Sequence, residues 1–387
     1  MERVEPAPRE RFVDPDRVEK IRTRLRTSDI DGLLGLSPAN SYYLSGAYFG
    51  FYQRPLAGVV TAETAGLVCS TIREATVRRT SWCDWGVLYG DTDDPFDALL
   101  EGIRRADVDT LGVDMSDSKW GTVSTLEREA DVTLLDRSEL FASLRARKTD
   151  WELDKIRRAG DLADAGIEAF VERAETGMTE VELVSEMETA YLDAYRKRHP
   201  EFDLGNASDG SQYSFTNVLA GGNAFSAGKL STSREIGDGD CVMSIAIPAL
   251  QGYHCENERA LVVGDPSDAV ISAMETHVDL RRAVIDYIGP DRTVAEVDSY
   301  AYDLFGERGY ELEHRTGHGL GISFHEEPSL NRRKSGHLDP GMVVTVEPGV
   351  YLPEEDAVIR HSDTVVVTDD GAERLTSTDD GVLMAGQ

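Results

Sequence analysis

The sequence predicts a protein of mixed α/β and α+β class with two packed domains, and three observations lead to that prediction. Short apolar runs alternate with helical stretches through residue 140. From residue 149 onwards, longer helices begin at Thr/Glu capping boxes, and the order of two helices followed by strands occurs twice. The 387 residues are enough for two ordinary domains. We therefore predict an N-terminal α/β domain over residues 1–147 and a C-terminal domain over residues 148–387 that contains an internal pseudo-repeat.

The N-terminal domain is predicted from the alternation of its elements. An amphipathic helix is expected over residues 17–28. The runs GLLGL, AGVVTA, AGLVCS, LGVD and VTLLD have the length and composition of buried strands, and they lie at residues 32–36, 57–62, 65–70, 111–114 and 132–136. Strands that alternate with helices in this way indicate an α/β unit with a mixed sheet.

The C-terminal domain begins at the segment TDWELDKIRRAGDLADAGIEAF, where Thr149 and Glu152 form a capping box and apolar residues follow at helical spacing. Two further helices are predicted where the same box recurs, at Thr179/Glu182 and Thr293/Glu296. Strands are predicted at CVMSIAIPAL, at ERALVVG, and over residues 342–351 and 358–368. The boundary at RARKTD has no long flexible linker, so we expect two domains that pack together.

The formal net charge of -31 is the most unusual bulk property of the chain. The acidic residues are spread through helices and turns, so the charge is a dispersed coat and not an interaction tail. Such a coat suits a cytosol with molar salt, where the Debye length is about 3 Å and self-repulsion is screened. We therefore infer a halophilic source. The same charge excludes nucleic acid and anionic membrane surfaces as expected partners.

The four cysteines, Cys69, Cys83, Cys241 and Cys255, form no CxxC pair, and we expect them to be reduced thiols. No stretch of the sequence approaches the roughly 18 apolar residues that a membrane span needs, and the charged N-terminus lacks the apolar core of a secretory signal. We expect a cytoplasmic protein.

Candidate catalytic residues gather late in the chain. Five of the eight histidines lie between residues 314 and 361, and the glycine-rich run HRTGHGLG and the following FHEEP place His318 and His325 in tightly turning backbone. In GMVVTVEPGVY, Glu347 ends a run of β-branched residues that we expect to be buried. Burying a carboxylate is unfavourable unless it is paired or bound to a cation, so Glu347 is either part of a site or part of a structural ion pair.

Taken together, HRTGHGLGISFHEEPSL, LDPGMVVTVEPGVYLP and RHSDTVVVTDDGAERLT resemble, in order and spacing, the motifs of the pita-bread family. That family includes creatinase, Xaa-Pro aminopeptidase (aminopeptidase P), prolidase and methionine aminopeptidase. The resemblance covers nearly the whole chain, with residues 16–140 similar to the N-terminal domain of the creatinase and prolidase branch. It implies a creatinase-type N-terminal domain, a C-terminal pita-bread domain and hydrolase activity.

In the metal-dependent members of the family, two Asp, one His and two Glu hold two divalent ions. The resemblance places His318 and Glu347 at two of these positions and Glu256 at a third, but Ile245 and Ser362 stand at the other two. Isoleucine cannot ligate a metal and serine is a poor substitute, so we expect no dinuclear centre. Glu256, His318 and Glu347 could still hold one Mn, Co, Zn or Fe ion, because three ligands and water make a workable open site.

The stretch IAIPALQGYHCENERAL is similar to creatinase, which needs no metal. This likeness implies that Glu258 and Glu347 bind a cationic group of the substrate, and that Arg54 reaches the partner's active site in a homodimer to bind a carboxylate. The histidine that creatinase uses as general acid and base is missing, because its position falls near Gly228. Its role could pass to another histidine, in the order His318, His325, His361.

Three interpretations of function follow from this pattern. The preferred one is hydrolysis of a C–N bond in a small zwitterion, of the creatinase or ectoine-hydrolase kind, without a metal cofactor. The first alternative is a proline-specific metallopeptidase of Xaa-Pro aminopeptidase or prolidase type with an altered metal site, which FHEEP favours because His325 matches a substrate-contacting histidine. The second alternative is an inactive family member that acts as a binding module.

Overall fold

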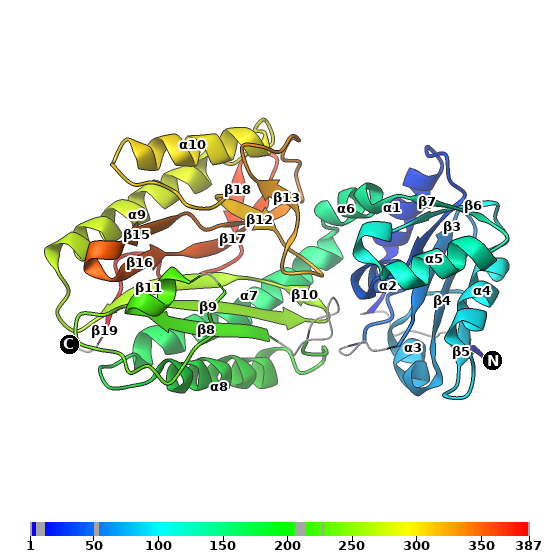
Figure 1. The fold of residues 1–387 in the computed structure, drawn as a ribbon, viewed down its shortest axis with the longest axis horizontal. Helices are drawn as coiled ribbons and strands as arrows, with labels where there is room; N and C mark the ends of the chain where they lie inside the picture. Colours follow the sequence, from blue (N-terminus) through cyan, green and yellow to red (C-terminus); the bar gives the residue numbers. More distant parts are fainter. Residues whose placement is uncertain (1, 5–11, 50–53, 206–213, 227, 386–387) are drawn as a thin grey trace. The chain divides into compact units, whose positions relative to one another are not determined.

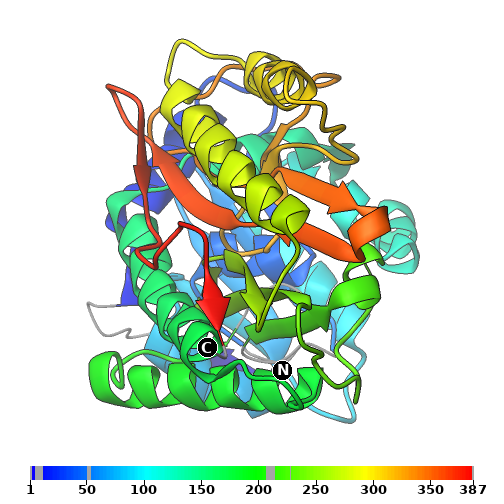
Figure 2. The ribbon, with the colours of Figure 1, turned by 90° about the vertical axis from the view of Figure 1, so that its left-hand side faces the viewer.

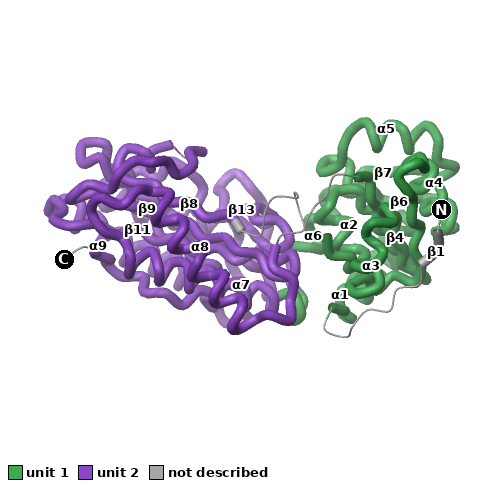
Figure 3. Tube along the Cα trace, turned by 90° about the horizontal axis from the view of Figure 1, so that it is seen from below, with its two compact units in different colours: residues 1–145, 149–152, 206–212 green, residues 146–148, 153–205, 213–387 purple. Residues whose placement is uncertain are grey.

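The computed structural model describes residues 2–4, 12–49, 54–205, 214–226 and 228–385. These residues form two compact units, which are coloured separately in Figure 3. The described part of the first unit lies within residues 1–145 and 149–152, and that of the second within residues 146–148, 153–205 and 214–385.

The first unit is a mixed sheet with helices packed on it (Figure 1). Its described strands run in the order β1-β5-β4-β3-β2-β6-β7, with parallel pairs β4–β5, β2–β6 and β6–β7 and antiparallel pairs β1–β5, β2–β3 and β3–β4. The strands are β1 (Glu2–Val4), β2 (Gly32–Gly35), β3 (Ala57–Thr61), β4 (Ala65–Ser70), β5 (Trp85–Tyr89), β6 (Thr110–Val113) and β7 (Thr133–Asp136). The helices are α1 (Pro15–Leu25), α2 (Pro38–Ser45), α3 (Glu74–Thr80), α4 (Pro95–Ala106), α5 (Trp120–Glu129) and α6 (Ser138–Ala146). The predicted mixed sheet is thus confirmed.

The second unit contains a sheet of ten described strands in which almost all pairings are antiparallel. Its strands are β8 (Ser214–Ala220), β9 (Cys241–Leu250), β10 (Tyr253–His254), β11 (Asn257–Val263), β12 (Gly317–Gly319), β13 (Glu326–Leu330), β14 (Val343–Val346), β17 (Ser362–Val367), β18 (Ala372–Arg374) and β19 (Met384–Ala385). A separate hairpin is formed by β15 (Gly349–Leu352) and β16 (Ala357–Arg360). The helices are α7 (Asp150–Arg173), α8 (Glu180–Arg198), α9 (Asp268–Tyr287) and α10 (Val294–Gly306).

Two helix pairs cover the strands of this unit from different sides. Figures 1 and 2 show α7 and α8 along one side of the strands and α9 and α10 along the other. Each pair buries its own apolar cluster: Ile167, Phe170 and Met187 pack with β8, β9 and β11, whereas Met274 and Phe305 pack with β14 and β17. The element order of two helices followed by strands is therefore repeated, as the sequence predicts.

The predicted capping boxes start the helices where expected. Thr179 accepts a hydrogen bond from the Glu182 backbone N–H at 3.3 Å, and the Glu182 carboxylate accepts one from the Thr179 backbone N–H at 2.8 Å. The same reciprocal pair opens α10 at Thr293. These bonds satisfy backbone donors that the first helical turn leaves without partners. Among the helices of the residues that the structure describes, none combines the length and apolar character that a membrane crossing requires.

Two strands that the sequence predicts as continuous are interrupted. The run 342–351 divides into β14 and β15 at Glu347 and Pro348, and the run 358–368 divides into β16 and β17 at His361. Pro348 has no backbone N–H to donate to a neighbouring strand, which explains why the ladder of the first run stops there. The interruption lets the β15–β16 hairpin leave the main sheet, and it leaves Glu347 at the end of β14.

Candidate active site

The strand register of the second unit brings the candidate residues onto one row. Ser362 of β17 pairs with Glu258 of β11, Glu258 pairs with Ile245 of β9, and Ile245 pairs with Asn217 of β8. Directly opposed residues of antiparallel strands project from the same face, with Cβ atoms about 5 Å apart. The row therefore connects four strands on one face of the sheet, and Glu347 follows at the end of the next strand, β14.

At one end of this row, Glu256, His318 and Glu347 converge. Each offers a ligand atom, and these atoms all lie within 4.8 Å of one another. The Nε2 atom of His318 is 3.7 Å from a Glu256 carboxylate oxygen and 3.5 Å from a Glu347 carboxylate oxygen. All three residues are buried. Within the part of the chain that the structure describes, this is the one His/Cys/Asp/Glu group with the geometry of a metal site.

The orientation of His318 follows from the local sequence GHG. A side chain at Gly317 would collide with the carbonyl oxygen of Thr345, so glycine lets β12 approach β14 closely. The Thr345 hydroxyl accepts a hydrogen bond from the His318 backbone N–H at 3.0 Å. The His318 Nδ1 lies 3.0 Å from the Gly319 carbonyl oxygen. Because a carbonyl only accepts, Nδ1 carries the proton, and the lone pair of Nε2 faces the two carboxylates.

Burial and the closeness of several carboxyl groups shift the pKa values of the residues in this cluster. Burial, followed by the charge of Glu347, raises the pKa of Glu256 to about 8. Burial and the charge of Glu258 raise the pKa of Glu347 to about 7. Burial also lowers the pKa of His318 to about 3, with His325 adding to the effect. A neutral imidazole beside two carboxyl groups that resist ionisation is what a buried cation site presents before a cation binds.

Glu258 has a cation partner within the chain. Arg360, at the end of β16, donates to its two carboxylate oxygens from Nε at 2.6 Å and from Nη2 at 2.8 Å. Both side chains are largely buried. Burial raises the pKa of Glu258 to about 7, and the charge of Arg360 opposes that rise. The predicted role of Glu258 as the binding group for a substrate cation therefore requires that cation to displace Arg360.

The positions where a second metal ion would need ligands do not supply them. Ile245 is apolar, and it lies opposite Glu258 in the strand register. Ser362 donates a hydrogen bond from Oγ to the Glu256 carboxylate at 2.7 Å, so it supports a ligand of the first site. The residues present thus fit one divalent ion on Glu256, His318 and Glu347, and they do not fit two.

The other candidate histidines are in different surroundings. His325 lies beside His318, with ring centroids 4.2 Å apart, and its side chain reaches solvent. His361 is fully buried, donates from Nε2 to the Ala260 carbonyl at 3.1 Å, and packs its ring on His277 of α9. Neighbouring residues of an extended chain point to opposite sides, and Ser362 points to Glu256. The shift of register that would bring His361 into the cluster does not occur.

Arg54 belongs to the first unit, where its exposed guanidinium pairs with Asp91. Its predicted role in a partner's site stays a prediction. Gly228 follows the short helix η4 (Gly221–Phe225) and lines a cavity of the second unit. All four cysteines are buried and unpaired with one another, and burial raises the pKa of Cys69, Cys83 and Cys241 to about 12.

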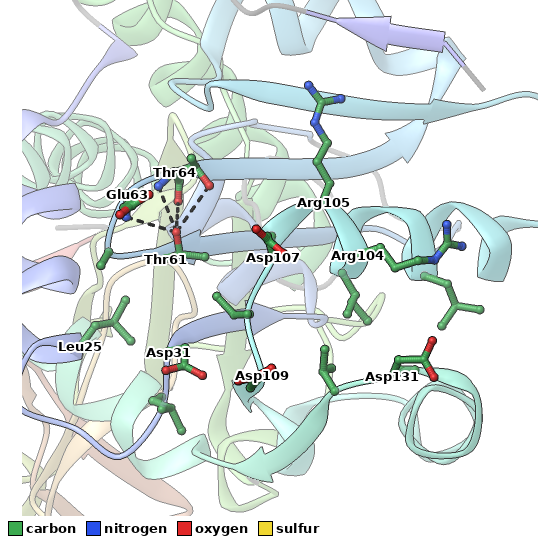
Figure 4. A pocket seen from close by; sticks show the side chains of 18 of the residues that line it. Leu25, Asp31, Thr61, Glu63, Thr64, Arg104, Arg105, Asp107, Asp109 and Asp131 are labelled. Carbon is green, nitrogen blue, oxygen red and sulfur yellow. Dashed lines mark hydrogen bonds between the residues drawn. The ribbon is translucent and has the colours of Figure 1, made fainter.

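A larger cavity, of about 970 Å³, lies in the first unit between the ends of its strands and α4 (Figure 4). Figure 4 shows Asp31, Asp107, Asp109 and Asp131 spaced around it, whereas Thr61 bonds the backbone of its own turn at Glu63 and Thr64. The acidic side chains do not converge on a common point as the cluster of the second unit does. The second unit therefore holds the candidate active site.

Arg360 is the residue of this site that the sequence analysis missed. A signal for it was present, because Arg360 and Ser362 are two residues apart and extended chain places such residues on the same side. The resemblance already put Ser362 at a ligand position. It follows that Arg360, and not His361, is the neighbour expected to face the cluster.

Comparison with known proteins places the chain in a family. Residues 154–369 match the model of metallopeptidase family M24, and residues 17–147 match the creatinase/prolidase N-terminal domain. A Xaa-Pro dipeptidase of Pyrococcus horikoshii is 29% identical over 94% of this chain and 97% of its own length, and one of Pyrococcus furiosus is 28% identical over 95% and 99%.

The solved structures agree on the fold. A prolidase from Pyrococcus horikoshii has a TM-score of 0.80 at 24% identity and covers 94% of this chain and 99% of its own. A Xaa-Pro dipeptidase from Bacillus anthracis has a TM-score of 0.81 at 24% identity, with coverage of 96% and 99%. The predicted creatinase-type and pita-bread domains are confirmed. The chain belongs to metallopeptidase family M24 and carries that family's creatinase/prolidase N-terminal domain.

Proposed function

We propose that this protein is a hydrolase of the Xaa-Pro dipeptidase type whose active site uses one divalent cation held by Glu256, His318 and Glu347. The convergence of three buried ligand atoms within 4.8 Å is the observation that carries the proposal. The two Pyrococcus relatives, at 29% and 28% identity, are named Xaa-Pro dipeptidases, which supports the choice of substrate class.

The donor set suits Mn, Co, Zn or Fe, because it combines hard carboxylate oxygens with one imidazole nitrogen. When bound, such an ion polarises a carbonyl group and lowers the pKa of a coordinated water. The protein holds the three ligands in place with a second layer of hydrogen bonds. The Gly319 carbonyl orients His318 through Nδ1, and the Ser362 hydroxyl orients Glu256.

The residues around the cluster have separate roles in this proposal. His325 is close to His318 but reaches solvent, so it is placed to contact a substrate and not to ligate the ion. Burial and Arg315 lower the pKa of His325, which leaves it neutral at pH 7 and able to accept or donate one hydrogen bond. We also keep the proposal that the protein is a homodimer in which Arg54 of one subunit serves the site of the other.

The metal-free, creatinase-like mechanism depends on a free Glu258. In this structure Arg360 already forms both of the hydrogen bonds that a guanidinium substrate would need from that carboxylate. For this reason we favour the dipeptidase over hydrolysis of a guanidino acid or a cyclic amidine. The ion-ligating geometry also gives a reason to prefer an enzyme over an inactive binding module.

Metal analysis combined with activity measurements tests the proposal. Protein freed of metal and reloaded with Mn²⁺, Co²⁺, Zn²⁺ or Fe²⁺ in high salt should retain one equivalent per chain and cleave Xaa-Pro dipeptides. His318→Ala and Glu347→Gln should lose both the ion and the activity, whereas His337→Ala, at an exposed histidine outside the cluster, should lose neither. Two equivalents of tightly bound metal would contradict the proposal. So would full activity of the metal-free protein, or cleavage of a guanidino acid in preference to dipeptides.

A further inference from the structure

The buried carboxylate of Asp298 lies at the base of the β12–β13 hairpin, which carries His318. Asp298 belongs to α10, on the face of that helix where Val297 and Ala301 enter the apolar core of the second unit. It is 2% exposed. Burying a carboxylate is unfavourable unless hydrogen bonds or an opposite charge compensate for the lost water, so an acid on this face has to be held by specific partners.

The two oxygens of the Asp298 carboxylate hold the two ends of the hairpin. Oδ1 accepts hydrogen bonds from the Thr316 backbone N–H at 2.8 Å and from the Thr316 hydroxyl at 2.7 Å. Oδ2 accepts one from the Arg332 backbone N–H at 2.7 Å. Thr316 directly precedes β12, and Arg332 comes two residues after the end of β13. Asp298 therefore ties both the start and the end of the hairpin to α10.

Thr316 connects this anchor to two of the proposed ion ligands. It is fully buried and lies two residues before His318 in the chain. Its carbonyl oxygen accepts a hydrogen bond from the Glu347 backbone N–H at 2.8 Å. The peptide groups around Thr316 thus link the chain that carries His318 to the chain that carries Glu347, and the carboxylate of Asp298 holds that link in place.

A second contact fixes the same strand further along. The Thr345 hydroxyl accepts a hydrogen bond from the His318 backbone N–H, and a side chain at Gly317 would collide with the Thr345 carbonyl. Thr345 therefore holds the middle of β12 against β14, whereas Asp298 holds its start. Loss of the Asp298 bonds would leave His318 held from one direction in place of two.

We infer that Asp298 is a positioning residue for the metal-binding cluster. By holding Thr316, it sets the spacing between His318 and Glu347. The inference rests on the proposed function and deepens it, because it names a residue outside the cluster on which the affinity for the ion depends. Ligand atoms must match the coordination distances of an ion to within about 0.2 Å, so a small displacement of either strand weakens binding.

Asp298→Asn is the sharpest test, because it preserves the shape of the side chain. An amide has one acceptor oxygen and one NH₂ group, whereas both oxygens of Asp298 face N–H donors. Whichever way the amide turns, its NH₂ group meets a backbone N–H, at Thr316 or at Arg332. Mn²⁺ should bind the metal-freed protein about tenfold more weakly, as expected when a residue that supports the ligands is lost.

Activity measurements separate positioning from substrate binding. With saturating Mn²⁺, Asp298→Asn should lower kcat for a Xaa-Pro dipeptide and leave KM nearly unchanged, because Asp298 acts through the backbone and not on the substrate. An increase in KM with native kcat would contradict the inference.

Asp114→Asn is the matched control. Asp114 belongs to the first unit, is also fully buried, and accepts hydrogen bonds from the backbone N–H groups of Leu36 and Ser37 at 2.8 and 2.9 Å. The same substitution should destabilise the first unit and leave the affinity for Mn²⁺ unchanged. An equal loss of affinity in Asp114→Asn would overturn the inference, and so would native affinity in Asp298→Asn.

Thr316→Val decides the inference if Asp298→Asn does not fold. Valine keeps the β-branched shape and the backbone bonds, and it removes the hydroxyl that donates to Asp298. Mn²⁺ should bind this variant more weakly than the native protein, and native affinity would overturn the inference.

Hydrogen exchange in the metal-free protein distinguishes failure of the inference from failure of the proposed function. If the native protein bound none of the four ions, the proposed function would fail. Exchange of the Glu347 backbone N–H would still report on the link to Thr316. Faster exchange there in the Asp298 or Thr316 variant, with a native rate in Asp114→Asn, supports the positioning role, and equal rates in all of them refute it.

Discussion

Replacing Arg360 with methionine should destabilise the second unit through the carboxylate it leaves behind. Arg360 forms two hydrogen bonds to Glu258, at 2.6 and 2.8 Å, and the Glu258 side chain is 3% exposed. Removing one partner of a buried ion pair leaves an uncompensated charge and costs about 3–5 kcal/mol. Methionine preserves much of the side-chain volume, so the loss reports on charge more than on packing.

The loss of unfolding free energy in Arg360→Met should depend on pH, and the protonation of Glu258 sets the direction of that dependence. Its pKa in the folded protein is raised to about 7, above the usual 4.5, so the charged carboxylate is destabilising when folded. This penalty is absent below the unfolded pKa and grows as pH rises through the folded pKa. Without Arg360 the folded pKa rises further. Arg360→Met should therefore cost more at pH 8, where Glu258 is ionised in the native protein, than at pH 5, where Glu258 is protonated.

A matched exposed pair provides the control. Arg157 binds Glu373 with the same two-bond geometry, at 2.7 and 2.9 Å, but these side chains are 43% and 52% exposed. Exposed pairs are worth about 0.2–1 kcal/mol, so Arg157→Met should be nearly neutral at both pH values. Glu258→Gln combined with Arg360→Met should cost less than the sum of the two single variants. Equal losses for the two methionine variants, or a loss at Arg360 that is the same at pH 5 and pH 8, would refute this reasoning.

The assay must report on the second unit. All four tryptophans lie in residues assigned to the first unit, at positions 82, 85, 120 and 151, so tryptophan fluorescence follows the wrong part of the chain. Hydrogen exchange of peptides that cover β11 and β17 follows the strands that carry Glu258 and its neighbours. A urea titration monitored by far-UV circular dichroism should be measured beside it.

Three further outcomes are expected. Gly317→Ala should reduce soluble expression and abolish metal binding, because its Cβ would collide with the Thr345 carbonyl; unchanged metal content measured by mass spectrometry would contradict this. Ser362→Ala should weaken metal affinity by about 10- to 100-fold with little loss of thermal stability, since it removes the hydroxyl that orients Glu256, and titration with Mn²⁺ would detect it. Metal binding by the ion-free protein should release protons between pH 6 and pH 8, because the pKa of Glu256 is raised to about 8; calorimetry in buffers of different ionisation enthalpy measures that release, and none would argue that Glu256 is not a ligand.

The parts of the fold that sequence predicts well are those decided by neighbours along the chain. The capping boxes at Thr179 and Thr293 need a residue pair three positions apart, and both helices begin there. The strands β4 and β9 match the apolar runs 65–70 and 241–250 in both bounds. The run 342–351 is predicted as one strand because composition does not reveal where a ladder stops. Pro348 ends the ladder within that run, since proline has no backbone N–H to donate.

The residues of the candidate site also fall into those that the local sequence predicts and those that only the tertiary structure reveals. Motif resemblance supplied His318, Glu347 and Glu256, and the structure brings these three together. The Glu258–Arg360 ion pair joins residues 102 positions apart. It forms because the separate β15–β16 hairpin packs against β11 of the main sheet. Pairings of this kind depend on register across strands, which is fixed by tertiary packing and not by either local sequence.

The charge of the site gives an independent argument for a single ion. Glu256, Glu258 and Glu347 carry three negative charges when ionised, Arg360 carries one positive charge, and His318 is neutral. Two negative charges remain in a buried cluster, which one divalent cation neutralises. A second divalent ion would need two more carboxylates, and Ile245 and Ser362 stand at the positions where the resemblance expects them. The Glu258 carboxylate does not meet that need, because Arg360 cancels its charge. The substitutions at these positions are therefore mutually consistent, and a variant that restores acid at 245 and 362 without removing Arg360 should be the one to take up two ions.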